Sequence, residues 1–286
     1  MLRKTIIASL FVSFTFSLAH SQTINDAVRF SSYDYASTAR SIGVGGAFSA
    51  LGADISAVNI NPAGLGEYRF GELVFSLGFN FDNQDASLAG QTPTSNRTAN
   101  SNLGVLGYVS TNRHRSSSAL DHSSFSISLN RFLNFDNAFE YQGTTAGSIT
   151  ERFTEQANTF APNDLDLFEG GPAFDAGAIF DFDGDLFYET DFGDFSTPVE
   201  RSQTVTRGGS GNELSLGYGA SLKKGLSFGV NLGIPIFSFE ETRSYTETDS
   251  SNSIDFFEEL QYDEVLETSG VGVNAKLGVI LSLIHI

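Results

Sequence analysis

The chain has no cysteine, no tryptophan, a single methionine and few basic residues. Without cysteine there is no disulfide framework, no thiolate metal site and no cysteine nucleophile. The 16 basic residues stand against 34 acidic ones, giving a formal net charge of -18. That charge argues against nucleic-acid binding, which needs a basic surface, and against attraction to an anionic membrane surface.

Long apolar runs are also missing from the chain after its first residues, so the sequence predicts no transmembrane helix. Residues 1–21 begin with Arg3 and Lys4, continue as an apolar and hydroxyl-rich run, and end in the small residues Ala19 and Ser21. This order is typical of a secretory signal peptide, with cleavage expected before residue 22. An uncleaved anchor is the alternative.

Phenylalanine and glycine are abundant instead, with 27 and 29 residues. Apolar side chains alternate with Ser, Gly and Asn; Val230, for example, belongs to an apolar face and Asn231 to a small polar face. A period of two indicates strands, which we expect near residues 70–82, 102–112, 123–143, 209–222, 225–246 and 264–283. One apolar face opposite a polar one is typical of lipid-facing and lumen-facing positions. We therefore predict an all-β fold, a transmembrane antiparallel β-barrel with about six strands.

The predicted connections alternate in length. Those at 113–122 and 223–225 are short, whereas long loops are expected at about 83–101, 144–208 and 247–263. Bacterial barrels have short periplasmic turns and longer extracellular loops, so each connection falls on the side that its length predicts. A soluble β-sandwich, whose meander can mimic this alternation, is the alternative.

The longest loop has two features of its own. Ile149, Phe153 and Ala157 recur at helical spacing and predict a short amphipathic helix, and residues 254–260 of the last loop are a second candidate helix. Asp183-Gly184-Asp185 suggests a calcium loop, but the glycine is not where an EF-hand needs it, and a phenylalanine stands in place of the closing glutamate. We predict an acidic solvated loop without a specific metal site, and leave open divalent ions bridging it to lipopolysaccharide.

Residues 37–66 differ from everything after them, because small residues and glycines dominate. Asp54 is a plausible helix cap, and we expect Asn61 to cap a turn begun by Pro62. Ala63 and Gly64 are small enough for this turn to lie against a wall of strands. A segment so poor in large side chains cannot bury enough area to fold alone, so it must be held inside something else.

These residues carry a resemblance. The ordered set Gly45 to Phe48, Leu51 to Asp54 and Asn61 to Leu65 resembles the N-terminal hatch of the FadL/TodX family, outer-membrane transporters for long-chain fatty acids and other hydrophobic compounds. The resemblance implies a hatch over residues 22–69 that plugs a barrel formed from residue 70 onward. The implied hatch and gating residues are Asn61, Pro62, Ala63, Gly64, Gly45, Gly46 and Phe48. A glycine-rich loop in a soluble protein is the alternative.

The resemblance also implies a function and a location. The function is passive uptake of a hydrophobic small molecule, such as a long-chain fatty acid or an aromatic hydrocarbon, without a cofactor. The location is the outer membrane of a Gram-negative bacterium, with the ligand, membrane lipid and lipopolysaccharide as partners. The same family fold also serves as a secretion-system barrel that binds or shuttles exported proteins, and this is the alternative function.

Family barrels have roughly fourteen strands, and known bacterial barrels begin at eight. About six predicted strands therefore leave the barrel incomplete, and we expect the 286 residues to be the N-terminal part of a longer protein. The tail at residues 281–286 resembles the translation of a sequencing adapter.

No catalytic constellation is predicted. His114 and His122 flank residues 116–121 in a predicted turn, but a flexible turn gives a serine nucleophile neither a fixed base nor an oxyanion site. Gly43-Val44-Gly45 lacks the third glycine of a dinucleotide-binding loop. We therefore expect neither enzymatic activity nor a nucleotide cofactor.

Overall fold

The structure is a computed structural model that describes residues 24–33, 38–193 and 195–283, so the predicted signal peptide lies outside it. The chain divides into two units, residues 1–34 and 35–286. In the first unit, α2 (Ile24–Ser31) is a short helix in which Arg29 and Asp26 form an ion pair of 2.8 Å. No helix in the described ranges is long and apolar enough to cross a membrane.

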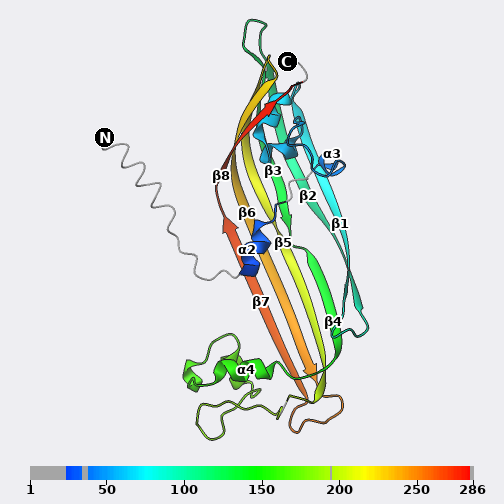
Figure 1. Ribbon diagram of the computed structural model, residues 1–286, viewed down its shortest axis with the longest axis vertical. Helices are drawn as coiled ribbons and strands as arrows, with labels where there is room; N and C mark the ends of the chain where they lie inside the picture. Colours follow the sequence, from blue (N-terminus) through cyan, green and yellow to red (C-terminus); the bar gives the residue numbers. More distant parts are fainter. Residues whose placement is uncertain (1–23, 34–37, 194, 284–286) are drawn as a thin grey trace, which may run out of the picture. The chain divides into compact units, whose positions relative to one another are not determined.

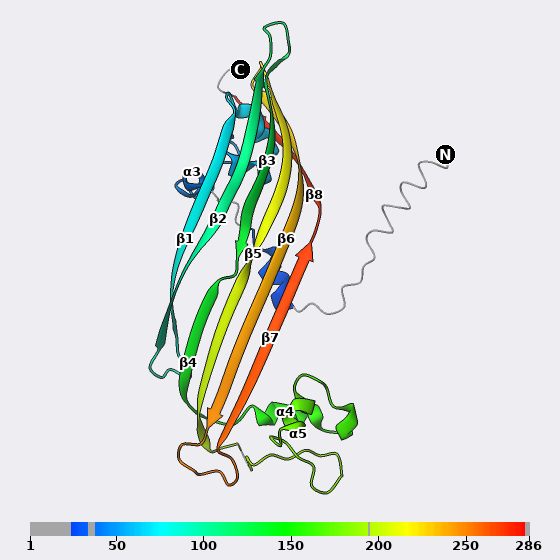
Figure 2. The ribbon, with the colours of Figure 1, turned by 180° about the vertical axis from the view of Figure 1, so that it is seen from behind.

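The second unit is built on one antiparallel sheet, which confirms the predicted all-β class. Its strands are β1 (Glu72–Ala86), β2 (Thr94–Arg113), β3 (Leu120–Asn134), β4 (Asn137–Ala146), β5 (Pro198–Leu222), β6 (Leu226–Thr248), β7 (Glu259–Val271) and β8 (Asn274–Leu281). The strand order is β1-β2-β3-β5-β6-β7, with β4 also paired to β5 and β8 to β6 (Figures 1 and 2). Within the described residues the sheet is not closed, and β1 forms one edge.

The eight strands correct the prediction of about six, because two predicted strands are each broken once. The predicted strand 123–143 is β3 followed by β4, interrupted at residues 135–136, and both halves pair with β5. The predicted strand 264–283 is β7 followed by β8, interrupted at residues 272–273, and both pair with β6. The chain therefore still makes six passes along the sheet.

Several strands extend beyond the alternating stretches, so the loops are shorter than predicted. The connections that follow β1, β4 and β6 are residues 87–93, 147–197 and 249–258. The ends at residues 83–86 of β1 and 94–101 of β2 were missed because polar and small residues occupy both of their faces, which removes the period-two signal. These three connections lie at one end of the sheet, the loop end; the short ones, 114–119 and 223–225, lie at the opposite turn end (Figure 1).

The connection after β4 contains α4 (Thr150–Ala157), η3 (Pro162–Asp164) and α5 (Gly170–Asp175). The helix predicted from Ile149, Phe153 and Ala157 is thus confirmed. It packs in a small core of its own, formed by Phe153, Ala157, Ala173, Ile179 and Tyr188.

The prediction of a second helix at residues 254–260 is wrong, because this segment is a turn that leads into β7. The carboxylate of Asp249 accepts hydrogen bonds from the backbone N–H groups of Ser253 (2.6 Å) and Ile254 (2.7 Å). Such local side-chain bonds to the backbone compete with helix formation.

The two faces of the sheet differ in chemistry. The outer face exposes large apolar side chains on every pass: Leu73, Phe75, Leu77, Phe79, Phe81, Leu106, Tyr108, Phe125, Ile127, Leu214, Leu216, Tyr218, Phe228, Val230, Leu232, Ile234, Ile236, Leu277, Val279 and Leu281. On β6 this apolar band ends at Ile236, and the outer positions from Ser238 to Thr248 are polar. The inner face is rich in Ser, Gly and Asn and holds residues 38–69, which we call the N-terminal segment.

Candidate functional site

The N-terminal segment contains three short helices, α3 (Ala39–Ile42), η1 (Ile55–Asn59) and η2 (Pro62–Glu67). Asp54 caps η1 by accepting from the backbone N–H of Ser56 at 3.0 Å. Asn61 caps η2 by accepting from the backbone N–H of Ala63 at 3.2 Å. Both caps confirm what the sequence predicted, because each depends on residues two positions apart.

An apolar core fixes the segment to the sheet. It is formed by Ile55, Val58, Leu65 and Tyr68 of the segment together with Val105 and Val109 of β2. None of these side chains is more than 4% exposed. Because burial of such side chains is the main stabilising contribution, this contact holds a segment that could not fold alone.

Glycines on the inner face allow the backbone of η2 to lie directly on the strands. A Cβ atom at Gly229 would overlap the carbonyl oxygen of Pro62, and one at Gly278 would overlap Oδ1 of Asn61. At Gly219 it would lie 2.6 Å from Cβ of Leu65. The glycines of β5, β6 and β8 are therefore required where this helix is seated.

Polar contacts also join the segment to the sheet. Oδ1 of Asn59 accepts from Oγ of Ser215 at 2.7 Å and from Nδ2 of Asn231 at 3.1 Å. Ser227 donates from its hydroxyl to Oε1 of Glu67 at 2.5 Å. Because Ser215 and Asn231 are fully buried beneath the segment, these bonds help to satisfy polar groups that water does not reach.

Part of the predicted gating set lies at this contact. Asn61, Pro62 and Ala63 meet β6 and β8, as expected for a turn against a wall of strands. The expectation for Gly64 was wrong, because a Cβ atom there would lie 3.0 Å from Cα of Gly52, within the segment itself. The residue of η2 that approaches the sheet in its place is Gly66.

The remaining predicted residues lie elsewhere in the segment. Gly45 and Gly46 form a turn after α3 with φ values of +64° and +75°, a conformation that favours glycine. A Cβ atom at Gly45 would meet nothing within 4 Å, so a close backbone approach is not the reason for this glycine. Phe48 is buried, and the guanidinium carbon of Arg40 lies 5.1 Å from its ring centroid.

Charged residues on the inner face were missed by the sequence analysis. Glu213 is fully buried and pairs with Nζ of Lys276 at 2.5 Å, while Nδ2 of Asn274 donates to it at 2.8 Å. The signal that could have found such residues is register. Glu213 directly precedes Leu214 on β5, and Leu214 and Leu216 belong to the apolar face, so alternation places Glu213 on the opposite, inner face.

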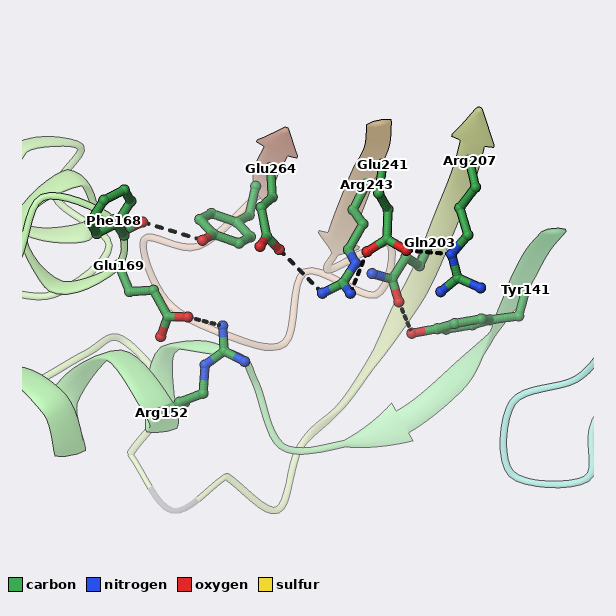
Figure 3. Close-up of polar contacts among 10 residues, drawn as sticks. Tyr141, Arg152, Phe168, Glu169, Gln203, Arg207, Glu241, Arg243 and Glu264 are labelled. Atoms are coloured by element: carbon green, nitrogen blue, oxygen red, sulfur yellow. Dashed lines mark hydrogen bonds and ion pairs between the residues drawn. The ribbon is translucent and has the colours of Figure 1, made fainter. Parts of the chain in front are cut away.

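A second charged group lies on the inner face at the loop end (Figure 3). Glu241 is 1% exposed and pairs with Arg207 and, at 2.5 Å, with Arg243. Arg243 also pairs with Glu264 on β7 at 3.3 Å. Nearby, the hydroxyl of Tyr141 donates to Oε1 of Gln203 at 2.5 Å. The group therefore links β4, β5, β6 and β7 across the sheet.

The acidic loop brings its three aspartates together. Carboxylate oxygens of Asp181, Asp183 and Asp185 lie within 4.8 Å of one another. Asp181 accepts from the backbone N–H groups of Gly184 at 2.9 Å and Leu186 at 3.2 Å. Bonds within the loop therefore explain its conformation.

The two histidines of the short turn contact different partners. Nε2 of His114 lies 2.8 Å from Oγ of Ser123, and Nδ1 of His122 lies 3.1 Å from a carboxylate oxygen of Asp121. A serine–histidine–aspartate triad needs one histidine between both partners, and neither histidine here has that arrangement.

Comparison of the chain with protein-family models, with curated proteins and with solved structures finds no match. Function is therefore inferred from the two faces of the sheet and from the contacts of the N-terminal segment.

Proposed function

We propose that this chain forms part of an outer-membrane β-barrel that takes up hydrophobic small molecules, with the N-terminal segment as its hatch. The observation that carries the proposal is the broad apolar band on the outer face, opposite an inner face on which the segment is seated. Soluble proteins rarely expose continuous apolar patches larger than a few hundred Å². A β-sandwich would cover this face with a second sheet, and the described residues contain one sheet.

The height of the apolar band supports a membrane-spanning position of the sheet. On β6 its exposed side chains extend from Phe228 to Ile236. A transmembrane β-strand needs about 9–11 residues, which this stretch matches. The polar outer positions from Ser238 onward then belong to a part of β6 that continues beyond the lipid. Further strands that join β1 to β7 and β8 are required, because an open edge in lipid leaves backbone groups unpaired.

The alternation of long and short connections and the resemblance to the FadL/TodX hatch support one orientation of the barrel in the outer membrane. The turn end, where the segment is seated, faces the periplasm, and the loop end faces the outside. A ligand captured among the loops passes along the inner face towards the segment. Buried aromatic side chains lie on that route, because Phe239 falls between Asn231 and Arg243 on β6 and packs on Phe135 with ring centroids 5.2 Å apart.

A seam in the wall offers a place for lateral release. β2 pairs with β3 from Val105 to Arg113, whereas its residues 94–103 pair with β1 alone in the described chain. β4, the next strand at this height, pairs with β5. The contacts across the seam are made by side chains, such as the bond from Nε2 of Gln91 to the carbonyl of Thr144 at 2.6 Å.

Uptake of labelled oleate and toluene tests the proposal. A strain that lacks the gene should take up less of at least one compound, and the natural gene should restore uptake. Gly64→Leu should change uptake at normal outer-membrane abundance, because the larger side chain displaces the turn at Gly52. If the deletion strain takes up both compounds normally but accumulates exported proteins in its periplasm, the transporter proposal is wrong and a secretion barrel replaces it.

A further inference from the structure

A cavity of ≈ 360 Å³ lies on the inner face at the loop end, between β4–β7 and the start of α4. Its size falls at the lower end of the range for small-molecule sites. Tyrosine and arginine dominate its lining, which includes Tyr141, Tyr245, Tyr262, Arg152, Arg201 and Arg243. The N-terminal segment and the apolar outer band contribute nothing to it, so this inference does not depend on the proposed uptake function.

Each arginine that lines the cavity is paired with a glutamate. Arg152 pairs with Glu169 at 2.9 Å, and Arg201 with Glu247 at 3.4 Å. The remaining pairs join Arg207 and Arg243 to Glu241, and Arg243 to Glu264. Four arginines thus stand against four glutamates. An anionic ligand would have to displace a glutamate from its arginine or leave a negative charge uncompensated, and either is costly where Glu241 and Glu247 are buried.

The hydrogen bonds within the cavity further restrict the chemical class of a matching ligand. The hydroxyl groups of Tyr141, Tyr245 and Tyr262 donate to Gln203, to Glu247 and to the carbonyl of Phe168, respectively. The hydroxyl proton of each tyrosine is therefore engaged in a hydrogen bond within the protein, while each phenolic oxygen can still accept a bond. Gln203 accepts through Oε1, which leaves its amide N–H groups as donors (Figure 3). The cavity offers donors and acceptors side by side, so a matching ligand both donates and accepts.

From this juxtaposition we propose that the cavity binds a neutral polyhydroxylated ligand, a sugar ring. Neighbouring hydroxyl groups both donate and accept, so they bond to tyrosine oxygens and to arginine or glutamine N–H groups at once. The aromatic side chains add apolar contact for the C–H surface of the ring. The same chemistry is presented by a free sugar and by the sugars of a surface glycolipid.

Binding is measured on the whole natural protein in a detergent without a sugar headgroup, because sugar detergents would occupy the cavity. The probes are D-glucose, D-galactose and the delipidated core oligosaccharide of lipopolysaccharide. Their binding is detected by saturation-transfer NMR and measured by calorimetry. Acetate and sulfate serve as anionic probes. Binding of a free hexose alone supports a soluble sugar as the source, and preference for the oligosaccharide supports a glycolipid.

The double variant Tyr141→Phe/Gln203→Leu should raise the Kd for the bound sugar at least about tenfold, because it removes an acceptor and a pair of donors. Tyr141→Phe alone is the milder variant, and a smaller rise is expected for it. Tyr218→Phe, on the outer face of β5, is the matched control and should leave the Kd unchanged. The inference is overturned if no sugar binds the folded protein, if acetate or sulfate binds more tightly, or if the variants bind as the natural protein does.

Discussion

Nδ2 of Asn61 lies 3.3 Å from the backbone carbonyl oxygen of Val279, a residue 218 positions farther along the chain. The same amide nitrogen donates to the carbonyl of Ser49 at 2.8 Å, while Oδ1 caps η2 at Ala63. One side chain therefore starts a helix, closes a turn of the N-terminal segment and attaches that segment to β8. A local cap and a long-range contact depend on the same residue.

Asn61→Ala should loosen η2 without unfolding the sheet. Loss of the cap alone costs about 0.5–2 kcal/mol, too little to disrupt the paired strands. Hydrogen exchange of the amides in residues 62–67 should become faster, while exchange in β5 and β6 stays unchanged. Asn61→Asp is the matched control, because it keeps an oxygen for the cap and loses the donor to the carbonyls of Ser49 and Val279. Unchanged exchange in the alanine variant would show that the cap does not hold η2.

Val230→Arg and Thr242→Arg test whether the outer band faces lipid. Both residues lie on the outer face of β6, Val230 within the band and Thr242 beyond it. Arginine at the bilayer midplane costs about 2–4 kcal/mol and near zero outside it. Unfolding titrations in lipid should therefore give a lower free energy of unfolding for Val230→Arg than for Thr242→Arg. Equal losses would contradict a lipid-facing position of the outer band. Asn231 is no suitable control, because it is buried against Asn59.

Lys276→Met should strongly destabilise the protein. Glu213 is fully buried, and removing the Lys276 cation removes the ion pair that compensates its charge, at a cost of up to about 3–5 kcal/mol. Urea unfolding in detergent measures the loss. The double variant Lys276→Met/Glu213→Gln should recover much of it, because the buried charge is then gone as well. A double variant no more stable than the single one would argue against the ion pair.

Glu247→Ala should release the connection between β4 and β5. The carboxylate of Glu247 accepts from Oγ of Ser148 at 2.5 Å and from the backbone N–H of Ile149 at 2.9 Å, just before α4. Each buried donor left without a partner costs about 1–3 kcal/mol. Limited proteolysis within residues 147–197 should become faster. Glu169→Ala, which removes a more exposed pair with Arg152, should have a small effect, since such pairs contribute about 0–1 kcal/mol.

The turn at residues 249–258 should open in acid. Burial alone would raise the pKa of Asp249, but bonds from backbone N–H groups and from Ser251 and Ser253 outweigh it and hold the pKa below the ordinary 3.8. A lowered pKa in the folded state stabilises the turn above pH 3.8, and that stabilisation is lost as the pH falls through the folded pKa. Amide NMR shifts of Ser253 and Ile254 should follow this titration. They should not titrate in Asp249→Asn, whereas Asp255→Asn, at an exposed position of the turn, should leave the titration in place.

The sequence by itself determined the all-β class, the two faces of the sheet and the caps of η1 and η2. Successive side chains of a strand point to opposite faces, so alternation reveals both faces wherever one of them is apolar. The caps at Asp54 and Asn61 were readable because each bond joins residues two positions apart. Alternation failed where both faces are polar, and it could not show the interruption at residues 135–136. There, the backbone N–H of Phe135 bonds to the carbonyl of Gly209 at 3.1 Å, from a distant strand.

Only the tertiary structure decided what the inner face holds. Asn59 meets Ser215 and Asn231 across 156 and 172 residues, and no local pattern encodes such a pairing. The glycines at positions 229 and 278 repeat at strand spacing like many others, and become necessary only because η2 lies on them. The charged residues around the cavity likewise come from separate strands, from α4 and from the start of α5. Their chemistry arises from strand register, which brings together residues that the sequence keeps apart.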